Sequence, residues 1–243
     1  MKLLFDIGNT RLKAALWGGG ELRPLGAVAH GESDHSALWR DIAGPESIWI
    51  ASVAAPAQDD ALARELRERF RREPRFVRSR AEACGVRSAY ARPERMGIDR
   101  FLALIAAHAH GAEPTVIANC GTALTLDALG ADGVHGGGLI LASPELMQAA
   151  LHGAAARLGA PAPGAIVEAA DNTADAIRSG AWLAAVAVTE RFHAHAAERF
   201  GTVPRLLLTG GGAARLGALI TTPHRLDPDL VLRGLALLAD AGG

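Results

Sequence analysis

The chain presents one strand-and-turn pattern twice, about half its length apart. In the first copy, an apolar run at 2–5 leads into the polar stretch Asp6-Ile7-Gly8-Asn9-Thr10, which indicates a buried strand ending in a turn. Arg11 to Trp17 and Leu22 to Ala29 follow as two more strands, separated by a run of glycines. The first copy therefore predicts an antiparallel meander.

The second copy begins near the middle of the chain. An apolar strand at Thr115 to Ala118 is followed by a polar turn at 119–122 and by strands at Ala123 to Leu129 and Val134 to Leu141. Laid on the first copy, the second matches Asn119 to Asp6, Gly121 to Gly8 and Thr122 to Asn9. A repeat of this period predicts two similar lobes.

Helices and further strands complete both lobes, which we place at 1–112 and 113–243. Between Asp59 and Arg72 an apolar residue recurs every four positions on a charged background, which is typical of an amphipathic helix, and Asp99 to His110 reads as a buried helix. The remaining predicted elements are strands at Ser47 to Val53 and Arg205 to Leu208 and helices at Glu145 to Leu158, Thr173 to Phe200 and Asp227 to Ala239. This order predicts an α/β protein whose lobes are each a mixed sheet with flanking helices, with a ligand site in the cleft between them.

Composition disfavours several classes of protein. Lys plus Arg number 25 against 26 for Asp plus Glu, so the net charge of -1 provides no uniform positive field for a nucleic acid. Cys84 and Cys120 are too few for a disulfide framework in 243 residues, and no apolar run is long enough to span a membrane. Asp6 interrupts the first apolar run, which therefore does not resemble a signal peptide. We expect a cytoplasmic protein.

The first turn carries residue types suited to a phosphate and its metal ion. Asp6 brings a carboxylate that can hold Mg²⁺, and Gly8 lets the backbone approach an anion closely. Lys13 lies on the next strand, and only Lys2 and Lys13 among the 25 basic residues are lysines. An ammonium there can reach the same phosphates. Two plainer interpretations stay open: a hairpin turn whose Asp6 and Asn9 only bond their own backbone, and a chance surface lysine.

Two more glycine turns follow predicted strands in the second lobe. The segment Gly121 to Thr125 has a glycine and hydroxyls at the position equivalent to the first turn. Gly210-Gly211-Gly212 follows the strand that ends at Leu208 and would let a flat purine or ribose lie against the backbone. A lone glycine triplet is ordinarily only a turn. Three glycine turns that each follow a strand favour a nucleotide-binding protein, in which one turn from each lobe binds the phosphates.

Asp99 and Arg100 follow Gly97 at the expected start of a helix. Asp99 can accept the proton of an attacking hydroxyl, and Arg100 can bind a substrate carboxylate or the transferred phosphoryl group. The alternative is that Asp99 only caps the helix. Cys120 lies in the second turn without a partner cysteine, so we expect it to be buried and inert.

Taken in order, these segments resemble the motif set of type III pantothenate kinases over nearly the whole chain. The matching segments are Asp6 to Lys13, Tyr90-x-x-Pro93-x-x-Met96-Gly97-x-Asp99-Arg100, Gly121 to Thr125, Gly137-Gly138-x-Ile140, Asn172-Thr173-x-x-Ala176-Ile177-x-Ser179-Gly180 and Thr209-Gly210-Gly211. The resemblance implies the actin-like, ribonuclease H-like fold of acetate and sugar kinases. It also implies ATP-dependent phosphorylation of pantothenate to 4′-phosphopantothenate, the first step of coenzyme A synthesis.

The same resemblance implies roles for individual residues and partners. Asp99 would be the general base, and Asp6 would hold the Mg²⁺ that accompanies ATP. ATP would contact Asp6, Ile7, Gly8, Asn9, Thr10, Arg11, Leu12, Lys13, Gly121, Thr122, Gly210 and Gly211. Pantothenate would contact Tyr90, Gly97, Ile98, Asp99, Arg100 and Thr173. The family is typically a homodimer in which the Thr173 region completes the partner's pocket, and it typically needs K⁺ or NH₄⁺, which we expect at Asn119.

Three positions depart from the family pattern. Asn119 stands where the family usually has Asp near the monovalent cation, so cation affinity should fall or the requirement change. Ala142-Ser143 replaces the usual Pro-Gly, with Pro144 one place later, and a backbone that needs positive φ would strain Ser143. Arg92 replaces a usual Asn and adds positive charge near an anionic substrate.

Two rival functions stay open beside the pantothenate kinase reaction that we expect. The first is another small-molecule kinase of the same fold, against which the segment Tyr90 to Arg100 argues. The second is a nucleotide-binding accessory or regulatory protein that has lost catalysis, suggested by Asn119 and Ala142-Ser143.

Overall fold

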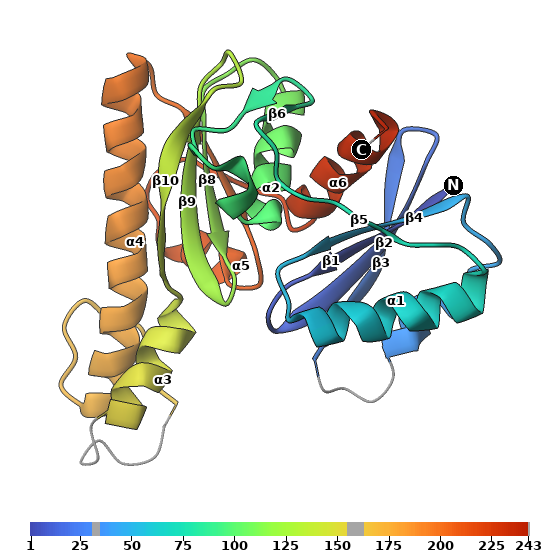
Figure 1. The fold of residues 1–243 in the computed structure, drawn as a ribbon. Helices are drawn as coiled ribbons and strands as arrows, with labels where there is room; N and C mark the ends of the chain where they lie inside the picture. Colours follow the sequence, from blue (N-terminus) through green and yellow to red (C-terminus); the bar gives the residue numbers. More distant parts are fainter. Residues whose placement is uncertain (31–34, 155–162, 243) are drawn as a thin grey trace. The chain divides into compact units, whose positions relative to one another are not determined.

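The computed structural model describes residues 1–30, 35–154 and 163–242, and its contacts group the chain into two compact units (Figure 1). Unit 1 comprises Met1–Ala112, Asp132–His135 and Asp229–Gly243, and unit 2 comprises Glu113–Ala131 and Gly136–Pro228. The repeated strand pattern predicts a mixed sheet in each lobe, and the structure contains two five-stranded sheets.

The sheet of unit 1 has the strand order β3-β2-β1-β4-β5. β1 pairs antiparallel with β2 and parallel with β4, while β2 pairs antiparallel with β3 and β4 pairs parallel with β5. The predicted meander is confirmed, and the sheet is mixed. Its strands are β1 (Lys2–Ile7), β2 (Arg11–Gly18), β3 (Glu21–Ala29), β4 (Ser47–Ser52) and β5 (Arg75–Phe76).

Side chains alternate between the two faces of this sheet, and helices cover both. The odd-numbered residues of β1 join a core that helix α1 (Pro56–Phe70) closes with Leu62 and Leu66. The even-numbered residues of β1 point to the opposite face, where helix α6 (Leu230–Asp240) packs, with helix α2 (Ile98–Ala109) beside it (Figure 1). Asp6 therefore lies on the face of the sheet that α6 covers.

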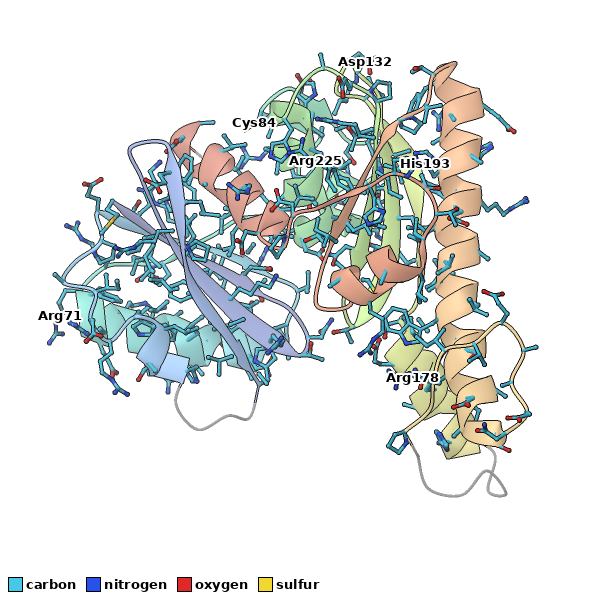
Figure 2. The ribbon with its side chains drawn as sticks, turned by 180° about the vertical axis from the view of Figure 1, so that it is seen from behind. Arg71, Cys84, Asp132, Arg178, His193 and Arg225 are labelled. Carbon is cyan, nitrogen blue, oxygen red and sulfur yellow. The ribbon has the colours of Figure 1, made fainter. Side chains whose placement is uncertain are left out.

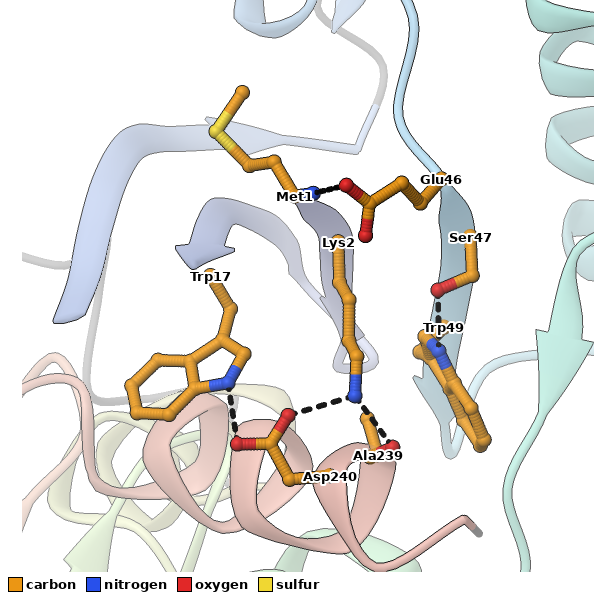
Figure 3. Close-up of polar contacts among 8 residues, drawn as sticks. All are labelled: Met1, Lys2, Trp17, Glu46, Ser47, Trp49, Ala239 and Asp240. Carbon is orange, nitrogen blue, oxygen red and sulfur yellow. Dashed lines mark hydrogen bonds and ion pairs between the residues drawn. The ribbon is translucent and has the colours of Figure 1, made fainter. Parts of the chain in front are cut away.

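Polar contacts tie the C-terminal helix α6 to the first two strands (Figure 3). The Lys2 Nζ donates to the Ala239 carbonyl at 2.6 Å and to the Asp240 carboxylate at 2.7 Å, and the Trp17 Nε1 donates to the other Asp240 oxygen at 2.8 Å. The Lys2 ammonium is the first cause of a lowered Asp240 pKa. These contacts explain why the end of the chain groups with unit 1.

The contact grouping differs from the predicted lobes, 1–112 and 113–243, in two segments. Asp229–Gly243 and Asp132–His135 belong to unit 1, although both follow the predicted boundary in sequence. The physical reason is burial: the apolar residues of α6 pack on the first sheet and on α2, and His135 packs on Tyr90.

The sheet of unit 2 has the order β10-β9-β8-β11-β12, which places its first to fifth strands as in unit 1. β8 pairs antiparallel with β9 and parallel with β11, as β1 does with β2 and β4. The repeat in the sequence is thus a repeat of sheet topology. The strands are β8 (Thr115–Cys120), β9 (Ala123–Leu129), β10 (His135–Ala142), β11 (Arg205–Thr209) and β12 (Arg225–Leu226).

Helices α4 (Thr173–Phe200) and α5 (Ala213–Leu219) pack on this sheet, and α3 (Pro144–Ala154) packs on α4. His193 of α4 is buried, and its Nε2 lies 2.8 Å from the Pro204 carbonyl oxygen just before β11 (Figure 2). Within the described part of the chain, no helix is long and apolar enough to cross a membrane.

Several element boundaries differ from the sequence predictions. β8 continues through Cys120, because Asn119 and Cys120 still pair with β9 instead of turning. α6 begins at Leu230 and not at Asp227. The Asp227 N–H donates to the Leu208 carbonyl of β11 at 2.9 Å, so Asp227 still belongs to the connection from the sheet. The helix predicted at Glu145 to Leu158 begins at Pro144. Residues 155–158 of the prediction lie outside the described residues. Several elements that are too short to show a periodicity were not predicted from the sequence. They are α5, β5, β12, η1 (His35–Leu38), β6 (Glu82–Ala83), β7 (Val86–Arg87) and η2 (Pro93–Arg95).

The packing of α6 on α2 leaves no room for a side chain at Gly234, where an added Cβ would overlap the Leu102 carbonyl. We expect Gly234→Ala to lower the free energy of unfolding by about 1–3 kcal/mol, measured by urea denaturation. Gly180→Ala on α4 is the matched control, because an added Cβ there meets no atom within 4 Å. It should raise stability by roughly 0.5–1 kcal/mol. Unchanged stability of Gly234→Ala would contradict the close contact.

Candidate functional site

The first hairpin sets Asp6 directly opposite Lys13. Asp6 is the penultimate residue of β1, and the antiparallel register pairs it with Lys13 of β2. Opposite residues of an antiparallel pair project to the same face, so a carboxylate and an ammonium share one side of the sheet. The Gly8 N–H donates to the Arg11 carbonyl at 3.0 Å and closes the turn. Among the described hydrogen bonds, none joins the Asp6 or Asn9 side chain to the backbone of this turn, so the plainer hairpin interpretation is not supported.

The surroundings of Asp6 raise its pKa to about 6 from the ordinary 3.8. The largest cause is the loss of hydration on burial, which the positive charge of Lys13 opposes and the negative charge of Asp99 reinforces. Asp99 comes from α2, far along the chain. The fold of unit 1 therefore brings two carboxylates and one ammonium into a single electrostatic neighbourhood.

Asp99 is the second residue of α2, and Gly97 occupies the N-cap position without a side-chain capping bond. The alternative that Asp99 serves as the helix cap is therefore wrong. An added Cβ on Gly97 would lie 2.6 Å from the Asp99 Oδ1. Glycine at this position leaves the room that the half-buried carboxylate uses.

Arg100 is buried, and its guanidinium contacts Tyr90. It donates to the Tyr90 hydroxyl at 2.8 Å and lies 5.6 Å from the centre of the Tyr90 ring. His135 stacks on the same ring with 6.1 Å between centroids, and the Ala89 N–H donates to the His135 Nδ1 at 3.4 Å. Two of the predicted substrate residues thus lie together, with a histidine holding the aromatic ring.

Sequence reasoning missed His135. This residue begins β10 directly before a run of three glycines, groups by contacts with unit 1, and is 1% exposed. A histidine that heads a glycine run was the available signal. Its contact with Tyr90 depends on a packing of distant segments that local sequence does not encode.

The second hairpin reproduces the backbone of the first but not its charges. Asn119 is the penultimate residue of β8, as Asp6 is of β1, and its register partner is Thr125 of β9. The Gly121 N–H donates to the Ala123 carbonyl at 2.9 Å, which is the counterpart of the bond in the first turn. An amide and a hydroxyl therefore replace the carboxylate and the ammonium.

The glycine run after β11 packs against the end of β8. Gly210 has φ +90°, and an added Cβ would lie 2.5 Å from the Cys120 carbonyl oxygen and 2.6 Å from the Asn119 Oδ1. The Gly212 N–H donates to the same carbonyl at 2.9 Å, whereas Gly211 has open space around its Cα. Burial raises the pKa of the Cys120 thiol to about 12, so the thiol stays protonated and unreactive, as the sequence predicts.

Thr173 opens α4, and it is exposed. Asn172 caps this helix by accepting from the Asp175 N–H at 3.0 Å, and the Asp175 carboxylate accepts from the Ala165 N–H at 2.6 Å. The Ser179 hydroxyl binds the backbone of the same preceding loop, accepting an N–H at 2.9 Å. The family-like segment 172–180 thus orders the loop before α4 and leaves Thr173 accessible within unit 2.

The strain expected at Ser143 is absent. Among the described non-glycine residues, positive φ occurs only at Arg71 and Cys84, both labelled in Figure 2. Ser143 lies directly before α3, where its hydroxyl accepts the Leu146 N–H at 3.1 Å, and Pro144 takes the first helical position. The departure from Pro-Gly therefore creates a helix cap.

No group of three or more His, Cys, Asp or Glu side chains that could hold a metal ion occurs among residues 1–30, 35–154 and 163–242. Mg²⁺ is usually bound by one or two carboxylates together with substrate phosphates and water. Asp6 offers such a carboxylate, and the amide oxygen of Asn119 can coordinate a monovalent cation.

The raised pKa of Asp6 predicts a pH dependence of stability. The contribution of protonated Asp6 is fully present below pH 3.8 and is lost as the pH rises through about 6, because only the folded chain retains the proton in between. Asp6→Asn cannot ionise. Its free energy of unfolding, measured in urea from about pH 4 to about pH 8, should therefore rise relative to the parent's as the pH increases. The exposed Asp60→Asn on α1 should follow the parent, and parallel profiles for Asp6→Asn and the parent would contradict the assignment.

Comparisons with known proteins identify the family of this chain. The family model described as type III pantothenate kinase matches residues 2–195. The chain is 46% identical to the type III pantothenate kinase of Xanthomonas euvesicatoria pathovar vesicatoria, over 98% of this chain and 97% of that protein. It is 45% identical to that of Xanthomonas campestris pathovar campestris strain B100, over 97% and 96% of the two chains.

Solved structures share the fold at low identity. A protein assigned to the Baf family of transcriptional activators from Campylobacter jejuni matches with a TM-score of 0.63 and 17% identity, over 99% of this chain and 98% of that one. A protein assigned as a 2-dehydro-3-deoxygalactonokinase from Sinorhizobium meliloti matches with a TM-score of 0.62 and 16% identity, over 99% of both chains. The predicted α/β fold, with two mixed sheets and flanking helices, is confirmed. Because the family model spans most of the chain and the relatives match nearly all of it, this chain belongs to the type III pantothenate kinase family.

Proposed function

We propose that this protein transfers the γ-phosphoryl group of ATP to the primary hydroxyl of pantothenate, which gives 4′-phosphopantothenate for coenzyme A synthesis. The observation that carries the proposal is the joint placement of Asp6, Lys13 and Asp99 in unit 1 of a chain of this family. Phosphoryl transfer needs positioned charges around the phosphates and a group that takes the hydroxyl proton. This cluster provides both.

The first turn is the proposed contact for the ATP phosphates. Lys13 would pair with phosphate oxygens, and Asp6 would hold Mg²⁺, which when bound neutralises charge on the β- and γ-phosphates. The second set of contacts is proposed at the equivalent turn and at the glycine run of unit 2. Open space at Gly211 supports close approach of a ligand there. The ATP residues are Asp6 to Lys13, Gly121, Thr122, Gly210 and Gly211.

Asp99 is the proposed general base. As the hydroxyl oxygen of pantothenate attacks the γ-phosphorus, the bond from that phosphorus to the bridging oxygen breaks and ADP leaves with the electron pair. The hydroxyl proton passes to the Asp99 carboxylate. Support comes from the half-buried position of Asp99 beside Gly97 and from its electrostatic contact with Asp6, where the metal and phosphates would lie.

Pantothenate carries a carboxylate, and Arg100 is the proposed cation for it. A guanidinium pairs with a carboxylate by two parallel hydrogen bonds, and Tyr90 with His135 holds this guanidinium in place. Arg92 is exposed two residues after Tyr90, where its charge would add to the attraction of an anion. The remaining proposed pantothenate contacts are Gly97, Ile98 and Thr173.

A homodimer is part of the proposal, with the Thr173 region of each protomer completing the other's pocket. Thr173 is exposed at the start of α4. Unit 2 also exposes large apolar side chains that an interface could cover. They are Leu139 and Ile140 on β10 and Leu146 and Leu151 on α3. Both cysteines are free thiols, which supports the cytoplasm as the proposed location.

Neither rival function is favoured. Loss of catalysis was suggested partly by Ala142-Ser143, and Ser143 proves to be an unstrained helix cap. Asn119 alone still suggests a loss of catalysis. Its amide oxygen can nevertheless coordinate K⁺, although it supplies no charge. A different small-molecule substrate would leave the Tyr90–Arg100 pair without the role proposed here.

Asp99→Asn keeps the size of the side chain but removes the base. We expect the kcat for pantothenate, measured in a coupled ATPase assay, to fall on the order of 10²- to 10⁴-fold, with the Kd for ATP retained. The exposed Asp60→Asn on α1 is the matched control and should keep the parent's activity. Near-normal turnover of Asp99→Asn would remove Asp99 from this role. A parent that binds ATP yet forms no phosphopantothenate at any K⁺ or NH₄⁺ concentration would favour the accessory function.

Asn119→Asp tests the proposed monovalent-cation site. A carboxylate in place of the amide would add an attraction on the order of 1 kcal/mol, so half-maximal activation should need about three- to tenfold less K⁺. The measurement is initial rate against KCl concentration at constant ionic strength. Identical K⁺ responses of the variant and the parent would place the cation elsewhere.

A further inference from the structure

His30 contacts the first turn at two points. This residue directly follows β3, and its backbone N–H donates to the Thr10 carbonyl at 2.8 Å. Its ring Nε2 lies 2.7 Å from the Gly8 carbonyl oxygen. Since a carbonyl can only accept, this contact is a hydrogen bond when Nε2 carries the proton, as it does in one neutral tautomer and in the charged ring. His30 thus contacts the carbonyl groups of Gly8 and Thr10, the residues before and after Asn9.

The contact with Gly8 determines where the next amide points. No cis peptide bond occurs among the described residues, and in a trans peptide the C=O and the following N–H point in opposite directions. The Gly8 carbonyl is directed at the His30 ring, so the Asn9 N–H is directed away from it. Asn9 is exposed, and no described hydrogen bond uses its N–H.

A cavity of about 240 Å³ lies behind the turn, between the sheet of unit 1 and α1, and His30 is part of its wall. His35 lines the same cavity, but its Nε2 lies 3.0 Å from the Glu65 carboxylate. The two histidines share an environment and differ in their partners: His30 contacts the turn, and His35 contacts α1. This difference supplies an internal control.

We propose that His30 is a positioning residue for nucleotide binding, which holds the Gly8 carbonyl so that the Asn9 N–H is presented to a phosphate of ATP. The inference rests on the proposed function only in assigning ATP to the first turn. His30 itself touches neither substrate nor metal in this role. It acts through the direction of one backbone donor, and preorganised donors of this kind favour an anion because they need no rearrangement on binding.

The test compares three variants of the full chain in Mg²⁺–ATP titration calorimetry and in steady-state kinetics. His30→Ala cannot donate to Gly8, and the Kd and KM for ATP should each rise about three- to tenfold, as expected for one lost hydrogen bond. The KM for pantothenate should stay unchanged. His30→Gln carries an amide donor and should restore most of the affinity. His35→Ala, in the same cavity, should match the parent.

Amide hydrogen exchange gives a readout that does not depend on turnover. The Gly8 amide donates to the Arg11 carbonyl and closes the turn, so it should exchange faster in His30→Ala than in the parent and more slowly again in His30→Gln. Equal ATP Kd values for His30→Ala and the parent would overturn the proposal. So would a rise in the KM of both substrates together, or a His30→Gln variant as weak as His30→Ala, because these indicate a general structural role.

The proposed function and this inference fail in different ways. If the parent binds ATP but does not phosphorylate pantothenate, the function is wrong, and the Kd comparison still decides the role of His30. If the parent phosphorylates pantothenate and His30→Ala binds ATP normally, only the inference is wrong. A parent that binds no ATP would overturn both.

Discussion

The pairing of Asp6 with Lys13 across the first two strands is the interaction on which the proposed site depends. Burial makes an ionised carboxylate unfavourable here, the ammonium opposite offsets part of that penalty, and Asp99 adds to it. A divalent cation with its phosphates would relieve the same repulsion. The carboxylates of Asp6 and Asp99 therefore lower the stability of the folded chain and are also the groups that the proposed reaction uses. Such a compromise is common at catalytic sites.

The two units share one backbone plan but differ in the side chains at equivalent positions. Both sheets have the same strand order, and both hairpins close their turns with a glycine N–H. Only the first hairpin carries an opposed carboxylate and ammonium, while the second has Asn119 and Thr125 at the equivalent register. The end of β8 instead packs tightly against the glycine run after β11. In the proposed site, the first copy would hold Mg²⁺ and phosphates through charged side chains, and the second would contact the ligand and a monovalent cation through backbone, amide and hydroxyl groups.

Two histidines contact residues of the proposed site, and sequence reasoning identified neither. His135 stacks on Tyr90, and His30 contacts the Gly8 carbonyl. His30 follows a strand with no local pattern to distinguish it, and the glycine run after His135 gives no indication of the ring that His135 contacts. The longer strands, by contrast, were predicted within one or two residues, because the alternation of apolar side chains reflects burial against a sheet. The two-residue strands β5, β6, β7 and β12 were missed. The short α5 and the cap at Ser143 were missed, since a single turn leaves little periodicity.

The sequence by itself determined the strand-and-turn repeat, the long helices, the glycine turns and the residue types at each strand end, because these follow from local hydrogen bonding and side-chain periodicity. Only the tertiary structure decided that Asp99 lies near enough to Asp6 to alter its pKa, and that α6 covers the first sheet. It also decided which ring His135 supports. The physical reason is that such contacts join residues far apart in the chain, and their geometry is set by how helices pack on sheets, which no short stretch of sequence specifies.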